Sequence, residues 1–338
     1  MSHTISAYND LVSLVDLELI QSRDFLMNEA IASGIFNRKA HPNYTGDTQR
    51  FQEFDMELYA KRKDEGQSAA SFQSQMGYSI DATVYRYAFN IDLSYEYRSY
   101  EKHDTTSSLI RGALQAQENK LDLDLQQLIS QATATSYTDN GGNTITTTVG
   151  DGLALASTAH TLLGTSDTYR NRLANNPQFS SGGLELMEQM WNENCLNHFG
   201  QKAYKKPTHI WSTDDPVVVN AIRKELASMA PVDAPNGNVL NPNKGKYQHV
   251  VFSKIAIDPT DGSPDTTKRN YWGLVAAGMD GWQAFFAVNE PAHRMPEADA
   301  SNTYDNKRDL YSIPMRIGYS YAVLSGRYFT ISTGDGTA

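Results

Sequence analysis

The clearest periodicity in the sequence is a strict alternation of apolar and polar side chains between residues 84 and 98, VYRYAFNIDLSYEYR. A period of two over this length predicts a β-strand with one buried face. Residues 311–323, YSIPMRIGYSYAV, alternate in the same way. We therefore expect two long strands that are distant in the chain and similar in pattern.

Helical spacings of three and four occur in other segments. Residues 104–132 predict a long helix of roughly 25 residues, or about 40 Å, with N-cap residues at its start. Residues 8–33 predict a helix that stops at Gly34, and residues 184–199 predict one that stops at Gly200. A further helix is expected after Asp215, because a proline follows at the first helical position.

The remaining segments suit an α+β fold. Residues 35–75 are polar and charged, without the period of a core helix, and predict an extended, projecting arm. Residues 133–150 predict a hairpin around the turn Asp-Asn-Gly-Gly. Shorter strands are expected at 208–212, 247–258, 270–277 and 282–288. This order suggests that the chain leaves one unit near residue 205 and re-enters it near residue 305.

Composition and charge narrow the function classes. The 338 residues include 40% hydrophobic and 20% charged side chains, as in a folded protein, and 19 tyrosines, which suit half-buried strands and protein interfaces. The net charge of −10 comes without a basic stripe, which argues against a protein that grips nucleic acid. No signal peptide and no apolar run long enough to span a membrane is visible.

Three groups of residues invite a chemical interpretation. Ser157 and His160 lie in DGLALASTAH but lack the flanking glycines of a nucleophile elbow, so a hydrogen-bonded loop is the better interpretation. Cys195, the only cysteine, lies three residues before His198 on the apolar side of an expected helix and is interpreted as a core thiol.

The third group lies in DPTDGSPD, where Asp258, Asp261 and Asp265 do not follow the calcium-loop pattern and predict a turn. No phosphate-binding or zinc motif is present. We therefore expect that the protein is not an enzyme and that it has no catalytic residue, no bound metal and no cofactor.

The stretch GDGLALASTAHTLLGTSDTYRNRLANN resembles the segment after the long helix in tailed-phage major capsid proteins akin to the Mu-like major head subunit. The matching positions are Asp151, Leu153, Leu155, Ser157, Thr158, Ala159, His160, Tyr169, Asn171 and Leu173. One departure is Thr161, where such relatives often carry proline. The order of elements also resembles the Hong Kong 97 (HK97-like) fold of these proteins.

The resemblance implies a domain organisation. It comprises an N-terminal arm (1–40), an extended loop (41–83), a peripheral domain (84–204) with the spine helix (104–132), an inserted axial domain (205–300), and return strands of the peripheral domain (301–338). DGLALASTAH would then be a connector near the spine helix.

The resemblance also implies a function, that of a shell subunit. Hexamers and pentamers of the chain would form an icosahedral phage capsid that encloses double-stranded DNA without sequence-specific binding. Its partners would be other copies of itself, with scaffolding, portal and decoration proteins, and no membrane. It would be assembled in the host bacterial cytoplasm and located in the virion. No long N-terminal scaffolding segment is visible, so scaffolding is expected to be separate or supplied by the arm.

Other interpretations stay open at this point. Some shells of this fold are sealed by a Lys–Asn isopeptide bond, and Lys61 and Lys63 lie in the arm, but no buried acid that would activate them is identifiable. A ladder of bands on denaturing gels would reveal such bonds. The alternative functions are an encapsulin-type nanocompartment shell, a tail or baseplate protein, and a hydrolase that uses Ser157 and His160.

Overall fold

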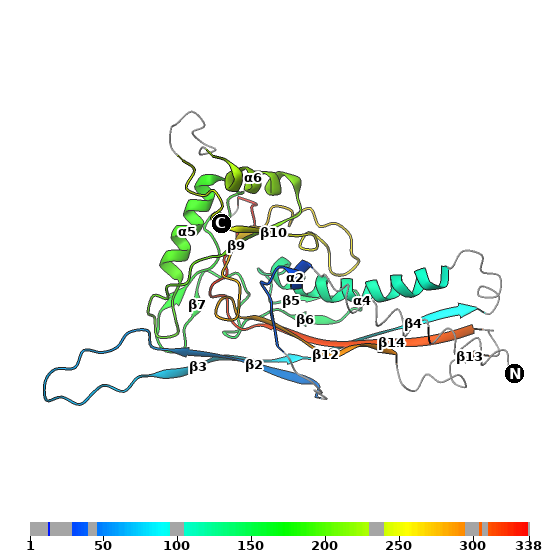
Figure 1. Ribbon diagram of the computed structural model, residues 1–338, viewed down its shortest axis with the longest axis horizontal. Coiled ribbons are helices and arrows are strands. Elements are labelled where there is room, and N and C mark those ends of the chain that lie inside the picture. Colours follow the sequence, from blue (N-terminus) through cyan, green and yellow to red (C-terminus); the bar gives the residue numbers. More distant parts are fainter. Residues whose placement is uncertain are drawn as a thin grey trace.

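The computed structural model describes residues 29–39, 46–94, 105–229, 240–294, 304–305 and 310–336, together with Ser13. The expected helix at 8–33 lies mostly outside this part; its described end is α2 (Glu29–Ala32), and Gly34 follows with a φ of 68°, as a helix stop requires. Three layers are visible in Figure 1: a long sheet below, the helix α4 along it, and a lobe above.

The long sheet joins strands from both ends of the chain. Its order is β1-β12-β14-β13, and β4 also pairs with β14. Its strands are β1 (Asn37–Arg38), β4 (Tyr85–Ser94), β12 (Ala284–Arg294), β13 (Tyr304–Asp305) and β14 (Leu310–Val323). The two alternating segments of the sequence are therefore antiparallel partners, and Tyr319 lies opposite Tyr85 in their register.

Helix α4 (Thr105–Ser130) covers one face of this sheet. Leu121, Leu125 and Ile129 are buried there against Tyr319 and Val323 of β14. This confirms the long helix expected from apolar spacing. Its buried carboxylate, Asp124, accepts hydrogen bonds from the hydroxyl of Tyr319 at 2.8 Å and that of Tyr87 at 2.8 Å.

The opposite face of the sheet is covered near the end of β14 by a two-stranded ribbon. It consists of β2 (Thr48–Met56) and β3 (Ser74–Thr83), which pair antiparallel. Phe51 of β2 stacks on Phe285 of β12, with ring centroids 5.8 Å apart, and packs in one cluster with Leu324. Beyond these contacts the ribbon projects away from the body (Figure 1). The expected projecting arm is thus a β-ribbon.

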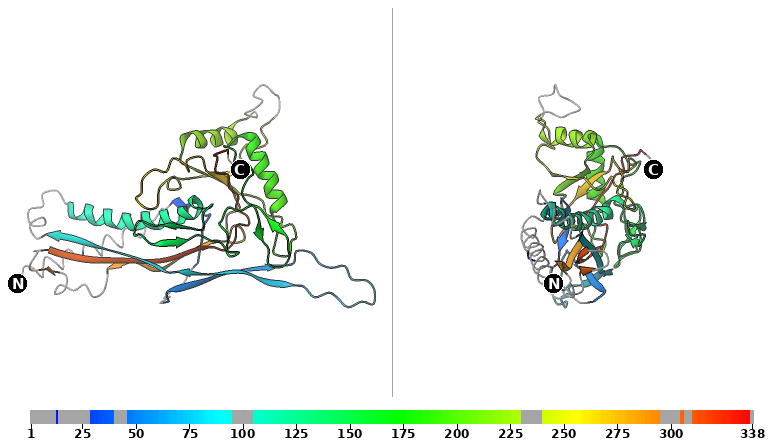
Figure 2. Two further views of the ribbon diagram at one scale, coloured as in Figure 1. Left: turned by 180° about the vertical axis from the view of Figure 1, so that it is seen from behind. Right: turned by 90° about the vertical axis from the view of Figure 1, so that its right-hand side faces the viewer.

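The upper lobe contains a second sheet and two helices. The sheet order is β10-β9-β11, and both helices pack on it in one buried cluster. The elements are α5 (Ser181–Asn194), β9 (His209–Thr213), α6 (Pro216–Ala227), β10 (Gln248–Phe252) and β11 (Trp272–Val275). Between α4 and α5 in the chain lie two hairpins, namely β5 (Ser136–Thr138) with β6 (Thr144–Thr146) and β7 (His160–Thr161) with β8 (Thr168–Tyr169). Figure 2 shows the lobe above the long sheet from two further sides.

Two expected boundaries differ from these layers. Helix α5 packs with the upper sheet, although the expected axial domain begins only at residue 205. The chain returns to the long sheet with β12 at Ala284, before the expected return at 301. Both differences arise because the place of α5 and β12 depends on what their buried faces pack against. The order of elements in the sequence does not reveal those packing partners.

The expected helix at 184–199 is wrong at its end. Helix α5 ends at Asn194, and Cys195 at its C-cap has non-helical angles, φ −79° and ψ 77°. The side-chain oxygen of Asn197 accepts hydrogen bonds from the backbone N–H groups of Phe199 and Gln201. This local turn competes with the helix and ends it six residues before Gly200.

Two other local predictions are confirmed. The carboxylate of Asp215 caps α6 by accepting the N–H of Val217 at 2.8 Å, and Pro216 opens the helix. The expected hairpin at 133–150 is β5–β6. The strand at 247–258 is shorter than expected, since β10 ends at Phe252 and the following backbone N–H groups bind side chains of α2 and α4.

Candidate functional site

Ser157 and His160 are not arranged as a catalytic pair. The Nδ1 atom of His160 lies 2.8 Å from a carboxylate oxygen of Asp151, and its Nε2 lies 3.0 Å from the carbonyl oxygen of Leu155. The ring is fully buried and stacks on Tyr169. The hydroxyl of Ser157 accepts the N–H of Ala159 at 3.3 Å. A general base needs a ring nitrogen directed at the nucleophile, and both nitrogens of this ring face other groups.

DGLALASTAH is thus a buttressed connector. Burial alone would raise the pKa of Asp151, but its hydrogen bond to and electrostatic interaction with His160 outweigh burial and lower this pKa. Asn171 completes the connector: its side-chain amide donates to the carbonyl oxygens of Leu155 and Gly326 at 2.6 and 3.1 Å. These bonds hold the connector against the segment that follows β14.

We expect Ser157→Ala to change the free energy of unfolding by less than about 1 kcal/mol, because one long hydrogen bond is lost. His160→Ala is expected to cost about 2–4 kcal/mol, because it leaves a buried carboxylate and a carbonyl without their partner. Urea unfolding of both variants measures this difference. An esterase or peptidase activity that disappears in Ser157→Ala would contradict this assignment.

The side chains of Cys195 and His198 contact different partners. The thiol of Cys195 is buried, donates to the carbonyl oxygen of Lys205 at 3.6 Å, and has a pKa raised by burial. The Nε2 atom of His198 lies 2.8 Å from a carboxylate oxygen of Glu53 on β2. This confirms a core thiol at Cys195.

The three aspartates near residue 260 form turns. Each accepts the backbone N–H of the residue two positions later, Thr260 for Asp258, Ser263 for Asp261 and Thr267 for Asp265. Within the part of the chain that the structure describes, no three His, Cys, Asp or Glu side chains converge as a metal site. Across the same described residues, no helix is both long and apolar enough to span a membrane.

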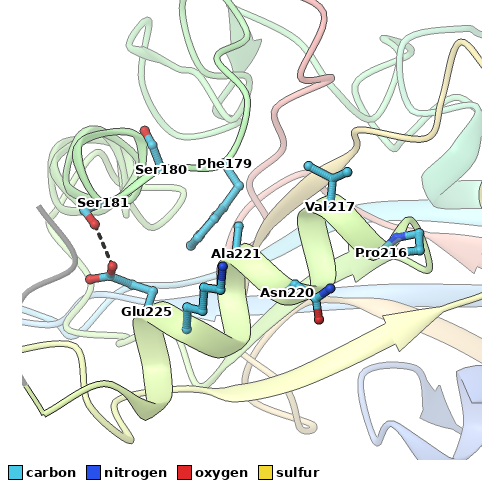
Figure 3. A pocket seen from close by; sticks show the side chains of 9 residues that line it. Phe179, Ser180, Ser181, Pro216, Val217, Asn220, Ala221 and Glu225 are labelled. Carbon is cyan, nitrogen blue, oxygen red and sulfur yellow. Dashed lines mark hydrogen bonds between the residues drawn. The ribbon is translucent and has the colours of Figure 1, made fainter.

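A cavity of about 550 Å³ opens between the start of α5 and helix α6. Phe179, Val217 and Ala221 supply its apolar wall, and Figure 3 shows Ser181 directed at Glu225. The hydroxyl of Ser181 donates to this carboxylate at 2.6 Å, and Ser180 caps α5 by accepting an N–H. Both serines are therefore used within the fold, and the cavity presents no nucleophile with a base.

The ribbon formed by β2 and β3 exposes several large apolar side chains to solvent. Its outward face carries Phe54, which is 60% exposed, directly opposite Met76, which is 67% exposed. Further exposed apolar side chains lie along it and its tip, namely Met56, Leu58, Tyr59 and Phe72. An apolar row on a projecting element marks an interaction surface rather than a catalytic site.

The basic residues of the ribbon tip point to solvent. Lys61 forms an ion pair with Glu57 at 3.2 Å, and its side chain is 53% exposed; Lys63 is also exposed. The side chain of Glu57, the partner of Lys61, is 9% exposed and belongs to the same tip. Isopeptide bond formation at these lysines stays a prediction.

The sequence did not reveal a group of charged residues that lies where the ribbon meets the body. Arg327, which follows β14, contacts Glu53 with one guanidinium nitrogen and Asp55 with the other, the latter at 2.7 Å. The inward positions of β2 alternate between polar and apolar side chains, Gln49, Phe51 and Glu53. Because these inward positions are not all apolar, the sequence did not identify β2 as a strand. The period of two in its burial is the signal that could have indicated it.

No family model and no curated protein matches this chain. Among solved structures, it is similar to a chain of "Gordonia phage Cozz", at 11% identity and a TM-score of 0.50, over 89% of this chain and 85% of that one. It is also similar to "The capsid of Myoviridae Phage XM1" (12% identity, TM-score 0.49, 89% and 90%) and "Capsid structure of the Cyanophage P-SCSP1u" (11%, 0.48, 88% and 85%). The first likeness shows that the fold is shared with a phage protein; the Mu-like subfamily stays a prediction.

Proposed function

We propose that the chain is the major capsid protein of a tailed bacteriophage, with the Hong Kong 97 fold. Its hexamers and pentamers would build an icosahedral shell around double-stranded DNA. The observation that carries this proposal is the β2–β3 ribbon, whose apolar outward face projects into solvent in the isolated subunit. The fold shared with a phage protein supports it.

An isolated two-stranded ribbon is marginally stable in water. Its tip, residues 57–73, is almost entirely exposed, and its contacts with its own body include hydrogen bonds such as that of the N–H of Leu58 to Gln201 at 2.8 Å. Phe54, Met76 and Phe72 contribute little to the stability of the isolated subunit, because their apolar side chains stay exposed to water. A second copy of the chain would cover these apolar groups, as expected for a permanent interface.

The domain names follow from the same proposal. The ribbon corresponds to the extended loop, α4 to the spine helix, the long sheet to the peripheral domain, and the upper lobe to the axial domain. Self-assembly then needs surfaces rather than a reactive pocket, and we propose that the protein is not an enzyme.

The charge of the chain supports enclosure of DNA rather than binding to it. A net charge of −10 would keep packed DNA from adhering to the inner wall. We propose that scaffolding, portal and decoration proteins assist assembly in the cytoplasm of the bacterial host and that the chain resides in the virion. An encapsulin-type shell is the alternative with the same fold, and it would contain a cargo enzyme in place of DNA.

Negative-stain electron microscopy of the purified protein after a sizing column tests the proposal. Closed shells, pentamers or hexamers are expected. Rings or tubes would favour a tail or baseplate protein. A chain that stays monomeric at high concentration and with crowding agents would contradict the proposal.

A further inference from the structure

A buried ion cluster lies at the root of the ribbon. Its members are Glu53, Asp55, Arg327 and His198, which we call the root cluster. Side chains of Arg327, Glu53 and His198 are 4%, 3% and 0% exposed. Asp55 also accepts the backbone N–H of His198 at 2.9 Å, so the cluster joins β2 to segments that follow β14 and α5.

The pairing of the ribbon is adapted to this cluster. The register of β2 and β3 shifts between Gln52 and Phe54, at the position of Glu53. Gly77 of β3 lies opposite, where an added Cβ would stand 2.8 Å from the Cβ of Glu53. The irregularity and the glycine together leave room for the carboxylate to turn toward the body.

Arg327 supplies the permanent positive charge of the cluster. The Nδ1 atom of His198 accepts the N–H of Leu163 at 3.4 Å, so the neutral ring with its proton on Nε2 satisfies both contacts. The ring of Tyr78 lies edge-on to His198. Tyr78, Tyr169 and Tyr328 face the cluster as neutral phenols, since burial raises the pKa of each.

The other charged groups nearby are already paired. Asp151 is bonded to His160 behind Tyr78, whose hydroxyl donates to the carbonyl oxygen of Thr161 at 3.0 Å. Two carboxylates on the ribbon therefore face one guanidinium on the body.

Apolar packing does not fix the ribbon beyond this point. The buried apolar cluster that β2 and β3 share with the body includes Phe51 and Ile80, and Tyr78 adds a ring contact with His198 at the root itself. Past the root cluster, the contacts with the body include hydrogen bonds such as that of the side-chain amide of Asn197 to the carbonyl of Met56 at 3.2 Å. The tip extends roughly 25 Å farther if its two limbs are extended, so a small rotation at the root displaces it by several ångströms.

We infer that Arg327 is a positioning residue, which fixes the direction of the ribbon through Glu53 and Asp55 and thereby determines where the ribbon meets a neighbouring copy. The local part of this inference holds for the isolated subunit. The part about the neighbouring copy rests on the proposed function.

The pH dependence of the root cluster follows from its carboxylates. Burial alone would raise the pKa of Glu53 and of Asp55, but the charge of Arg327 and hydrogen bonds from His198 outweigh it and lower both. A lowered pKa in the folded state means that the stabilisation is present above the ordinary carboxyl pKa. It is lost as the pH falls through the lowered values. The ribbon is thus expected to stay fixed at neutral and mildly acidic pH.

Hydrogen exchange of the full-length protein, with particle imaging, tests the inference on three variants. Arg327→Met removes the guanidinium that both carboxylates face and leaves them their hydrogen bonds with His198. The triple variant Arg327→Met, Glu53→Gln, Asp55→Asn keeps the shape without charge, so it folds even where the single variant does not. Arg327→Lys keeps the charge but not the two-pronged contact. The matched control is Arg50→Met, which removes an exposed ion pair with Asp81 on the same ribbon.

Amides of β2 and β3 are expected to exchange about tenfold faster or more in the triple variant, with a smaller change in Arg327→Lys and none in the control. Amides of β12 and β14 away from the ribbon keep their protection. Particles of the triple variant should vary more in diameter than those of the wild type. Wild-type exchange of the ribbon in the triple variant overturns the inference.

Faster exchange with particles of unchanged, uniform diameter overturns its second part, the effect on the neighbouring copy. If the wild-type chain forms no particles, the proposed function fails, and the exchange experiment still decides the local role of Arg327.

Discussion

Replacing residues 58–72 by Asn-Gly is expected to yield a folded subunit that no longer assembles. The backbone N–H of Glu57 already bonds the carbonyl of Gln73 at 3.1 Å, so a two-residue turn can close the ribbon at this pair. The removed residues contribute little to the fold, because they are exposed and make few contacts with their own body. The midpoint of urea unfolding should therefore stay close to that of the wild type.

Assembly should respond in the opposite way, because the removed tip carries Leu58, Tyr59 and Phe72, which we expect a neighbour to cover. A second variant with a Gly/Ser segment of equal length in place of 58–72 separates loss of these side chains from loss of reach. Both variants should elute as small species from a sizing column. Shells of wild-type size from the shortened chain would show that the tip is not an assembly contact.

Trp282→Ala is expected to cost about 3–5 kcal/mol of unfolding free energy, the usual cost of truncating a large buried aromatic side chain. Trp282 is fully buried and stacks on Phe329 at 4.5 Å between ring centroids, and it also contacts Phe36 at 5.4 Å. Phe329 stacks in turn on Trp211 of β9. This row of rings joins the long sheet to the upper sheet, so its loss loosens both layers.

Trp282→Phe is the matched control. The indole nitrogen of Trp282 has no hydrogen-bond partner among the described residues, so the phenyl ring loses only volume. We expect a cost of about 1–2 kcal/mol, well below that of the alanine variant. Urea unfolding followed by tryptophan fluorescence measures both. Equal costs for the two variants would mean that the row of rings does not stabilise the contact between the sheets.

The sequence predicted the elements whose side chains repeat with one period. The alternation around Tyr87 and around Tyr319 identified β4 and β14, and the pattern around Leu125 identified α4. The turn chemistry at Asp215 was equally informative, because a capping carboxylate and a proline act locally. Such signals need no knowledge of what packs against them.

The ribbon and its root were out of reach for a physical reason. Glu53 is a buried charge in a strand, and nothing near it in the sequence indicates its partner, Arg327, which lies 274 residues away. The partner of His160 in the connector was equally hard to predict. Ser157 and His160 are close in sequence, but His160 binds Asp151, and only the folded chain reveals this contact. Long-range pairing of polar groups determined both sites.

The most direct test of the account is a three-dimensional reconstruction, by electron cryomicroscopy, of particles assembled from the wild-type chain. The account predicts a closed shell in which the ribbon of each subunit lies on an adjacent copy and the exposed Phe54, Met76 and Phe72 become buried. A closed shell whose ribbons extend freely into solvent, or particles whose subunits touch only through the upper lobe, would contradict it.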